Sequence, residues 1–276
     1  MERFFCGVDL CIFVTVKPFK MNRIITIISL CLFGNTLSAQ TPTMKKNWYY
    51  PMPSGIVTNM IEDTANNQLI INGSFDALYS PQRYGVVASL VDGSIPTDMD
   101  CPNAEVFASV SDGNGGWYIG GDFTLVGDSS RYRLAHIDQN GFVTGWNLNL
   151  SVGTVHSLAI EGSTLYIGGL FTSINGELRN NLAAIDLSTN TVLSWNPNVN
   201  DDVYQIYVKE SEVYISGNFT NVGGLSRDWI ASLDVATGGV NSWNPITDFN
   251  ARIVAVSDTS VYLAGSFTQV NGINRN

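Results

Sequence analysis

The chain has 276 residues, of which 14% are charged and 45% are hydrophobic, and its formal net charge is −10. This hydrophobic fraction can form a core, so the composition excludes a wholly disordered chain. The acidic balance argues against nucleic acid or an anionic membrane as a partner, because both are bound by basic surfaces.

The first 39 residues have the layout of an export signal. A basic start at 21–23 precedes the apolar run 24–32, and Ser38 and Ala39 offer a cleavage site before Gln40. This order predicts a Sec-type signal peptide over 1–39, with translation starting at Met21 and 1–20 being a misassigned start. A helix that spans a membrane needs about 20 apolar residues, and the run 24–32 is shorter than that. We therefore read this run as part of the signal peptide and expect no membrane span in the mature chain. An N-terminal membrane anchor is the alternative.

Removal of this leader changes the charge and the cysteine count. It takes away four basic and two acidic residues, so the net charge goes from −10 to −12. Of the four cysteines, only Cys101 remains, and a single cysteine can form no internal disulfide. The exported domain, residues 40–276, must therefore be held by packing and hydrogen bonds.

A phenylalanine recurs every 48 residues along this domain. A glycine stands two residues before each phenylalanine, and an arginine stands eight residues after it. A fixed period of this length indicates a propeller, a solenoid or another array of repeats. The phenylalanines are Phe75, Phe123, Phe171, Phe219 and Phe267.

The third unit shows the expected order of elements. Four runs rich in β-forming residues, at 155–160, 164–169, 182–185 and 191–195, are separated by turn residues. Four short strands in one unit predict one propeller blade. We therefore expect an all-β chain, a β-propeller of four-stranded blades with a 48-residue repeat, comprising four full blades and a partial fifth.

The last unit stops after two expected strands, at 253–256 and 261–265, so the repeat domain is expected to be a truncated sequence, incomplete at its C-terminus. A complete five-bladed ring whose closing blade has three strands, with 48–51 supplying its outer strand, is the alternative. Such a ring would leave a strand edge unpaired, which favours truncation.

The recurring residues have structural explanations. The glycine suits a β-bulge or a close backbone approach, where a Cβ would clash. An aspartate after the third strand can accept turn N–H groups, a tryptophan can pack between blades, and the arginine can bind loop carbonyls or the aspartate of a neighbouring turn. The sets are Asp138, Asp186 and Asp234; Trp146, Trp195 and Trp243; and Arg83, Arg131, Arg179, Arg227 and Arg275.

The string Tyr-Ile-Gly-Gly-x-Phe-Thr, then Arg, Leu-Ala-x-Ile-Asp and Trp-Asn-Pro, resembles the delta-sixty-type β-propeller repeats of exported bacterial proteins. The resemblance covers residues 48–276 and implies a secreted or cell-surface protein. Many such proteins end in a sorting domain for type IX secretion. This chain departs from the pattern at its C-terminus and in its first unit, where Asp76 replaces the threonine.

Motifs for catalysis or cofactor binding are not found in the sequence. His136 and His156 lie in different units without metal-ligand spacing, and we expect both to be satisfied strand residues. The turn beginning at Asp138 lacks the later glutamate of a calcium loop. No nucleophile elbow, phosphate loop or dinucleotide fingerprint occurs. We expect no enzyme activity, no metal and no cofactor.

A carbohydrate-active enzyme is the alternative function, since some glycosidases are propellers. Such an enzyme needs two carboxyl groups at a set separation, one of them with a raised pKa. The candidate acids near blade edges are Asp98, Asp100, Asp201 and Asp202.

Residues that break the repeat are the best candidates for a specific function. One position near the start of the first strand reads Phe107, His156, Tyr204 and Arg252 in successive units. In propellers this position lies near a face where ligands bind. We expect these four residues to bind a ligand, and the protein to be a non-catalytic scaffold for a protein or glycan outside the cell. A lectin with equivalent sites in every blade would bind multivalently.

Overall fold

The structure is a computed structural model that describes residues 56–63, 68–77, 80–89, 96, 98–150 and 152–275. The chain divides into two compact units, 1–43 and 44–276, and the described residues all lie in the second. The expected signal peptide and the expected outer strand at 48–51 lie outside the described residues. The described part contains no helix, and so none long and apolar enough to cross a membrane.

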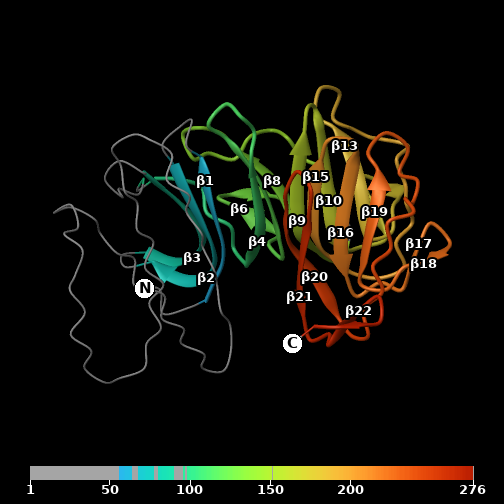
Figure 1. Cartoon of the computed structure of the whole chain (residues 1–276). Coiled ribbons are helices and arrows are strands. Elements are labelled where there is room, and N and C mark those ends of the chain that lie inside the picture. The colour runs from blue at the N-terminus through green and yellow to red at the C-terminus, as the bar shows by residue number, and fades with distance from the viewer. Residues whose placement is uncertain are drawn as a thin grey trace, which may run out of the picture. The chain divides into compact units, whose positions relative to one another are not determined.

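The described residues form an all-β fold of consecutive antiparallel sheets (Figure 1). The main sheets have the strand orders β1-β2-β3, β4-β5-β8, β9-β10-β13-β14, β15-β16-β19 and β20-β21, and none of them is closed. First strands are Ile56–Asp63 (β1), Val106–Ser111 (β4), Thr154–Glu161 (β9), Val203–Lys209 (β15) and Ala251–Val256 (β20). Second strands are Gln68–Ala77 (β2), Trp117–Gly121 (β5), Thr164–Leu170 (β10), Glu212–Gly217 (β16) and Val261–Gly265 (β21). Third strands are Ser80–Ser89 (β3), Leu134–Ile137 (β8), Leu182–Asp186 (β13) and Ile230–Asp234 (β19).

The third unit confirms its predicted strands, with Thr191–Val192 (β14) as a short outer strand. In the second and fourth units the outer strand is reduced to single bridges, Ile137 with Val143 and Leu233 with Val240. Gly141 and Gly145 lie two residues to either side of Val143, and Gly239 directly precedes Val240. Glycine weakens a strand because it costs more conformational entropy and packs no side chain. The prediction of four full strands in each unit is therefore wrong for the second and fourth units.

A small hairpin follows the second strand in each unit from the second to the fifth. In the third unit, the sequence predicts a loop at this place rather than a hairpin. Each hairpin turns on glycine-bearing residues between two-residue strands. The pairs are Leu125–Val126 (β6) with Ser129–Ser130 (β7), Ser173–Ile174 (β11) with Glu177–Leu178 (β12), Asn221–Val222 (β17) with Leu225–Ser226 (β18), and Gln269–Val270 (β22) with Ile273–Asn274 (β23).

The core lies between consecutive sheets. In one cluster Ala108 and Leu134 of the second unit pack with Val155 and Leu158 of the third. The next cluster joins the third and fourth units in the same way. Every residue of β5 is buried, because its sheet is covered on both faces. This explains why the second strands read as continuous apolar runs rather than as an alternating pattern.

The recurring arginines bind carbonyl oxygens, as predicted. Arg131, Arg179 and Arg227 each donate from Nη2 to a carbonyl two residues before the tryptophan, over 2.5, 2.6 and 2.9 Å. Each guanidinium also donates to the carbonyl of the residue before it. The arginine therefore links the small hairpin to the outer edge of its unit.

The tryptophans and aspartates also have the predicted roles. Trp195 is buried and donates its indole N–H to the Asp234 carbonyl of the next unit over 3.1 Å. Asp186 accepts the Ser188 backbone N–H over 2.8 Å, which closes the turn after the third strand. Hydrogen bonds from Ser188 lower the pKa of Asp186 because they stabilise the carboxylate.

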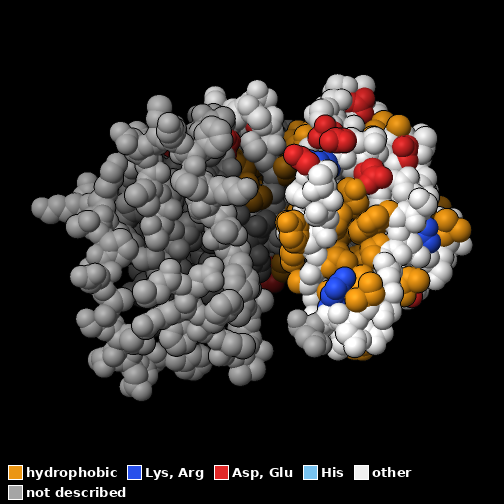
Figure 2. Space-filling view, viewed as in Figure 1, with side chains coloured by type: hydrophobic (Ala, Val, Ile, Leu, Met, Phe, Trp, Pro, Cys, Tyr) orange, Lys and Arg blue, Asp and Glu red, His pale blue; other side chains and the backbone are white. Residues whose placement is uncertain are grey.

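The last hairpin, β20-β21, exposes much of its apolar surface. Val254 is 49% exposed and Tyr262 is 57% exposed, although Ala251 and Ile253 are buried against the preceding sheet. Figure 2 shows hydrophobic side chains on the surface around this hairpin.

Candidate ligand-binding site

β-bulges present three of the four predicted binding residues. The register of β4, β9 and β15 shifts around one residue in each strand, and the extra residues are Phe107, His156 and Tyr204. A bulge leaves its extra residue outside the ladder and redirects its side chain. In β20 the shift falls at Val254 instead, so Arg252 remains paired with Ala264.

The repeated glycines permit these bulges, as predicted. A Cβ on Gly121, Gly169 or Gly217 would lie within 2.0 Å of the carbonyl oxygen that precedes the bulged segment. No side chain fits at that distance, so each second strand needs glycine where the first strand approaches.

The four predicted residues lie in one unbroken line of contacts, here named the stacking row (Phe107, His156, Tyr204 and Arg252). The Phe107 and His156 rings are 5.3 Å apart between centroids, and the His156 and Tyr204 rings are 5.5 Å apart. The Arg252 guanidinium carbon lies 4.7 Å from the Tyr204 ring centroid, which is cation–π geometry. Four residues from four different units therefore form one continuous surface.

Asp202 supplies a carboxylate beside the row. It precedes the bulge of β15, and its residue exposure is only 8%. Its Oδ2 lies 3.2 Å from His156 Nε2, whereas its Oδ1 is buried with no hydrogen-bond partner in the described structure. Buried carboxylate oxygens normally have partners, so Asp202 retains unused capacity to accept a hydrogen bond.

Charges along the row act on the Tyr204 phenol. Burial raises the pKa of Tyr204, and the Asp202 carboxylate raises it further, whereas Arg252 lowers it. The phenol oxygen accepts a hydrogen bond from Asn218 Nδ2 over 2.6 Å. The Tyr204 side chain therefore contacts Asn218 through its phenol oxygen and Arg252 through its ring. The His156 side chain is 24% exposed.

Of the acids considered for glycoside hydrolysis, Asp202 and its neighbour Asp201 lie by the row, whereas Asp98 and Asp100 belong to the second unit. Asp100 accepts the Val143 backbone N–H over 2.8 Å in the second unit, and Asp98 is exposed. Asp201 uses Oδ1 to accept the N–H of Asp202. Of these four acids, Asp202 alone forms an ion pair with a member of the stacking row.

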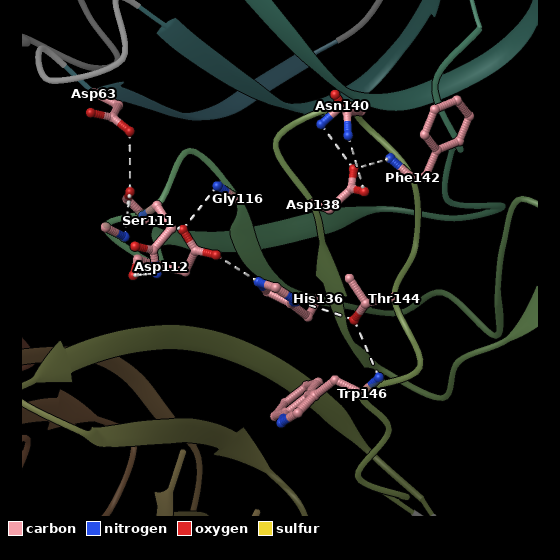
Figure 3. A network of polar contacts seen from close by, with 12 residues as sticks. Asp63, Ser111, Asp112, Gly116, His136, Asp138, Asn140, Phe142, Thr144 and Trp146 are labelled. Atoms are coloured by element: carbon pink, nitrogen blue, oxygen red, sulfur yellow. Dashed lines mark hydrogen bonds and ion pairs between the residues drawn. The ribbon is translucent and has the colours of Figure 1, made fainter. Parts of the chain in front are cut away.

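The other histidine lies in a closed polar network (Figure 3). His136 Nε2 is 2.9 Å from Asp112 Oδ2, and its Nδ1 is 3.1 Å from Thr144 Oγ1. Asp112 Oδ1 also accepts the N–H groups of Asn114 and Gly116, and Thr144 accepts that of Trp146. Because each group already has partners, this network is a structural element, as expected for a satisfied strand histidine.

The turn at Asp138 binds its own backbone. Its Oδ1 accepts the N–H groups of Asn140 and Phe142, both over 2.9 Å (Figure 3). Chiefly the bond from Phe142 lowers the pKa of Asp138. Across the described residues, no cluster of three or more His, Cys, Asp or Glu side chains is placed to hold a metal ion.

Comparisons with known proteins give structural likeness only. No family model matches the chain, and no curated protein matches it. It is similar to the computationally designed Ika4 protein, with 13% identity and a TM-score of 0.47, over 70% of this chain and 100% of that one. It is also similar to the designed Ika8 protein, with 13% identity and a TM-score of 0.45, over 78% of this chain and 61% of that one.

Sequence reasoning missed the residues that flank the row. Asp202 was considered only as one of several loop acids, and Asn218 was not considered. The sequence does carry a signal for Asn218, because the residue between the repeated glycine and phenylalanine varies as Ser74, Asp122, Leu170, Asn218 and Ser266. This varying position sits beside the varying row.

Proposed function

We propose that the chain is an exported β-propeller repeat domain, of the delta-sixty type, that binds a glycan or protein ligand at the stacking row and catalyses no reaction. The fixed 48-residue period and the consecutive antiparallel sheets support the propeller. The basic and apolar leader supports export to the cell surface or the exterior. A bacterial cell surface offers both classes of ligand.

One observation carries the binding proposal. At the first-strand position that differs between units, the four side chains form one line of successive contacts from Phe107 to Arg252. A position that served only packing would carry the same residue in each unit, as the position of the repeated phenylalanines does. A row made of two rings, an imidazole and a guanidinium instead supplies stacking faces and hydrogen-bond donors, which are the usual components of a binding surface.

A glycan array probed with the purified chain tests this proposal. The double variant His156→Ala, Arg252→Ala removes the centre and one end of the row. We expect it to lose the binding of any glycan that the wild type retains. The matched control Lys209→Ala changes a partly exposed residue of the fourth unit that pairs with the exposed Asp258 and lies outside the stacking row, and it should bind as the wild type does.

Two outcomes contradict the proposal. Unchanged binding by the double variant would place the ligand elsewhere on the chain. Release of reducing ends from a polysaccharide by the wild type would show an enzyme, and the non-catalytic assignment would then be wrong.

A further inference from the structure

An open cleft lies between the third and fourth units. Its volume is about 610 Å³, and every residue that lines it is uncharged. In a chain with a net charge of −10, an uncharged depression selects against ionic ligands. We name this depression the Asn cleft. The side chains that line it include Val152, Leu170, Asn180, Asn198, Asn200 and Asn221.

Two departures from the repeat form this cleft. Five positions separate Leu150 from Val155, whereas four separate the equivalent Val199 from Val203, so the third unit carries one extra residue. The extra length leaves Val152 72% exposed. Leu170, which is 49% exposed, occupies a position that is polar in the other four units. Two aliphatic side chains are thus presented to solvent at one place.

The amides of the cleft offer both donors and acceptors. Asn180 Nδ2 donates to Asn198 Oδ1 over 2.7 Å, which leaves the Asn180 oxygen and the Asn198 amide hydrogens without another partner among the described residues. Asn221 accepts the Gly224 N–H through Oδ1 and keeps its own amide hydrogens. Asn200 Oδ1 already accepts the backbone N–H groups of Thr220 and Asn221, and Asn200 Nδ2 donates to Thr220 Oγ1.

We propose that the Asn cleft is a subsite for a neutral oligosaccharide that extends from the stacking row, an inference that rests on the proposed function. A sugar hydroxyl both donates and accepts, so it fits the alternating groups of Asn180, Asn198 and Asn221. The apolar C–H face of a sugar ring fits the aliphatic surface of Val152 and Leu170. A ligand with ionised groups would find no opposite charge in the cleft.

The cleft and the row share the same strand ends. Leu170 pairs with Thr154 in the β9-β10 ladder, and Thr154 stands two residues before His156. Asn200 stands two residues before Asp202, on the segment that enters β15. A chain of sugar units bound at His156 and Asp202 can therefore continue along these ends into the cleft.

A peptide fits this lining less well. Extended peptides gain affinity by adding a strand to an open sheet edge. The lining of the cleft consists of strand ends and connecting loops, together with the first residue of β17. It offers separate side-chain amides rather than a row of backbone groups.

Isothermal titration calorimetry of the full chain with sugars of two lengths tests the inference. The probes are cellohexaose, xylohexaose and mannohexaose, each with its trisaccharide, and the galacturonic acid hexamer as a charged comparison. We expect the preferred neutral hexamer to bind about tenfold more tightly than its trimer, which corresponds to about 1.4 kcal/mol. The charged hexamer should not share this gain.

The variant Leu170→Asn introduces the residue that the fourth unit carries at the same position, so the fold should accept it. It should remove the advantage of the hexamer while leaving trimer affinity unchanged. His156→Ala should weaken trimer and hexamer alike. Hexamer binding unchanged in Leu170→Asn overturns the cleft inference and leaves the row intact. If the wild type binds no sugar but binds a protein through the row, the cleft inference is also overturned and the row remains a binding site. If trimer binding is unaffected by His156→Ala, the proposed function itself is overturned.

Discussion

Two histidines of this chain pair with aspartates, yet their surroundings differ. His136 has Asp112 on one ring nitrogen and Thr144 on the other, and Tyr118 stacks on its ring at 4.4 Å. His156 has Asp202 on Nε2 only, and no partner for Nδ1 lies among the described residues. The first pair is complete within the protein, whereas the second leaves a ring nitrogen and a carboxylate oxygen unused.

The contrast shows that pairing alone does not distinguish a structural histidine from a binding one. The polar set around His136 has a counterpart in the fourth unit, where Asn241 donates to Ser232 and Glu212. The fold therefore tolerates different side chains there provided that they satisfy one another. At the stacking row the differing side chains leave capacity unsatisfied, and buried unsatisfied groups carry a free-energy cost. We infer that a ligand offsets this cost at His156 and Asp202.

The largest effect is expected from Gly217→Ala, which breaks the His156–Asp202 pair through the backbone. The added Cβ would lie 1.9 Å from the Asp202 carbonyl oxygen, so the bulge must move. We expect the free energy of unfolding to fall by about 3 kcal/mol or more, at the upper end of the range for overpacked sites, because the atom that the Cβ meets belongs to the backbone. Urea denaturation followed by tryptophan fluorescence measures this change.

Gly145→Ala is the matched control, because no atom lies within 4 Å of its added Cβ. Its stability should be unchanged or raised by up to about 1 kcal/mol, since alanine restricts the unfolded chain. Equal destabilisation by the two variants would show that the close approach at Gly217 does not determine the bulge.

A smaller but more selective effect is expected from removing each histidine in turn. His136→Ala leaves Asp112 and Thr144 without their shared partner in a half-buried network, so we expect a loss of about 2 to 3 kcal/mol in unfolding free energy. His156→Ala removes one partner of Asp202, and because the His156 side chain is 24% exposed the carboxylate becomes open to water, so the loss should be smaller, below about 2 kcal/mol. Thermal and urea unfolding of both variants test the order.

The reversed order would contradict the comparison between the two pairs. A large loss for His156→Ala would make the stacking row a structural element, and the binding proposal would lose its main support. His136→Gln keeps a donor beside Asp112 and an acceptor within reach of Thr144, so it should recover part of the loss.

Much of the fold was predictable because the repeat is strict. The phenylalanine period marks each unit, and the glycine before it marks the bulge, since only glycine fits against the carbonyl of Asp202 or Thr154. The stacking row was predictable for the opposite reason. A position that varies among otherwise similar units stands out when the units are aligned.

The rest depended on interactions that alignment of units does not reveal. The outer strands at Val143 and Val240 shrink to bridges where glycines stand within two residues and weaken them, although the same register forms β14 in the third unit. The Asn cleft arises from an inserted residue near Val152 together with Leu170, and the sequence pattern does not show that both side chains are exposed at one place. Asp202 becomes informative only when its burial and its unpaired oxygen are seen together.

The smallest effect concerns the tyrosines beside the two pairs. Burial raises the pKa of Tyr118 and of Tyr204, and the nearby Asp112 or Asp202 adds to it, but only Tyr204 has an arginine that opposes the rise. Arg252→Gln should therefore raise the pKa of Tyr204 further and leave that of Tyr118 unchanged, because loss of a cation disfavours the phenolate. An NMR titration of the chain labelled with carbon-13 at tyrosine Cζ measures both groups.

Burial and Glu212 raise the pKa of Tyr214 to about 12, so this tyrosine provides an internal reference that Arg252→Gln should not move. Since the folded-state pKa of Tyr204 lies above the unfolded value, its phenol favours folding below the unfolded pKa, and that contribution is lost as the pH rises through the folded pKa. The variant should therefore enlarge this loss and extend it to higher pH, while its onset at the unfolded-state pKa stays the same. A Tyr204 titration identical in wild type and variant would mean that Arg252 does not rest on the ring in solution, and the row would then end at Tyr204.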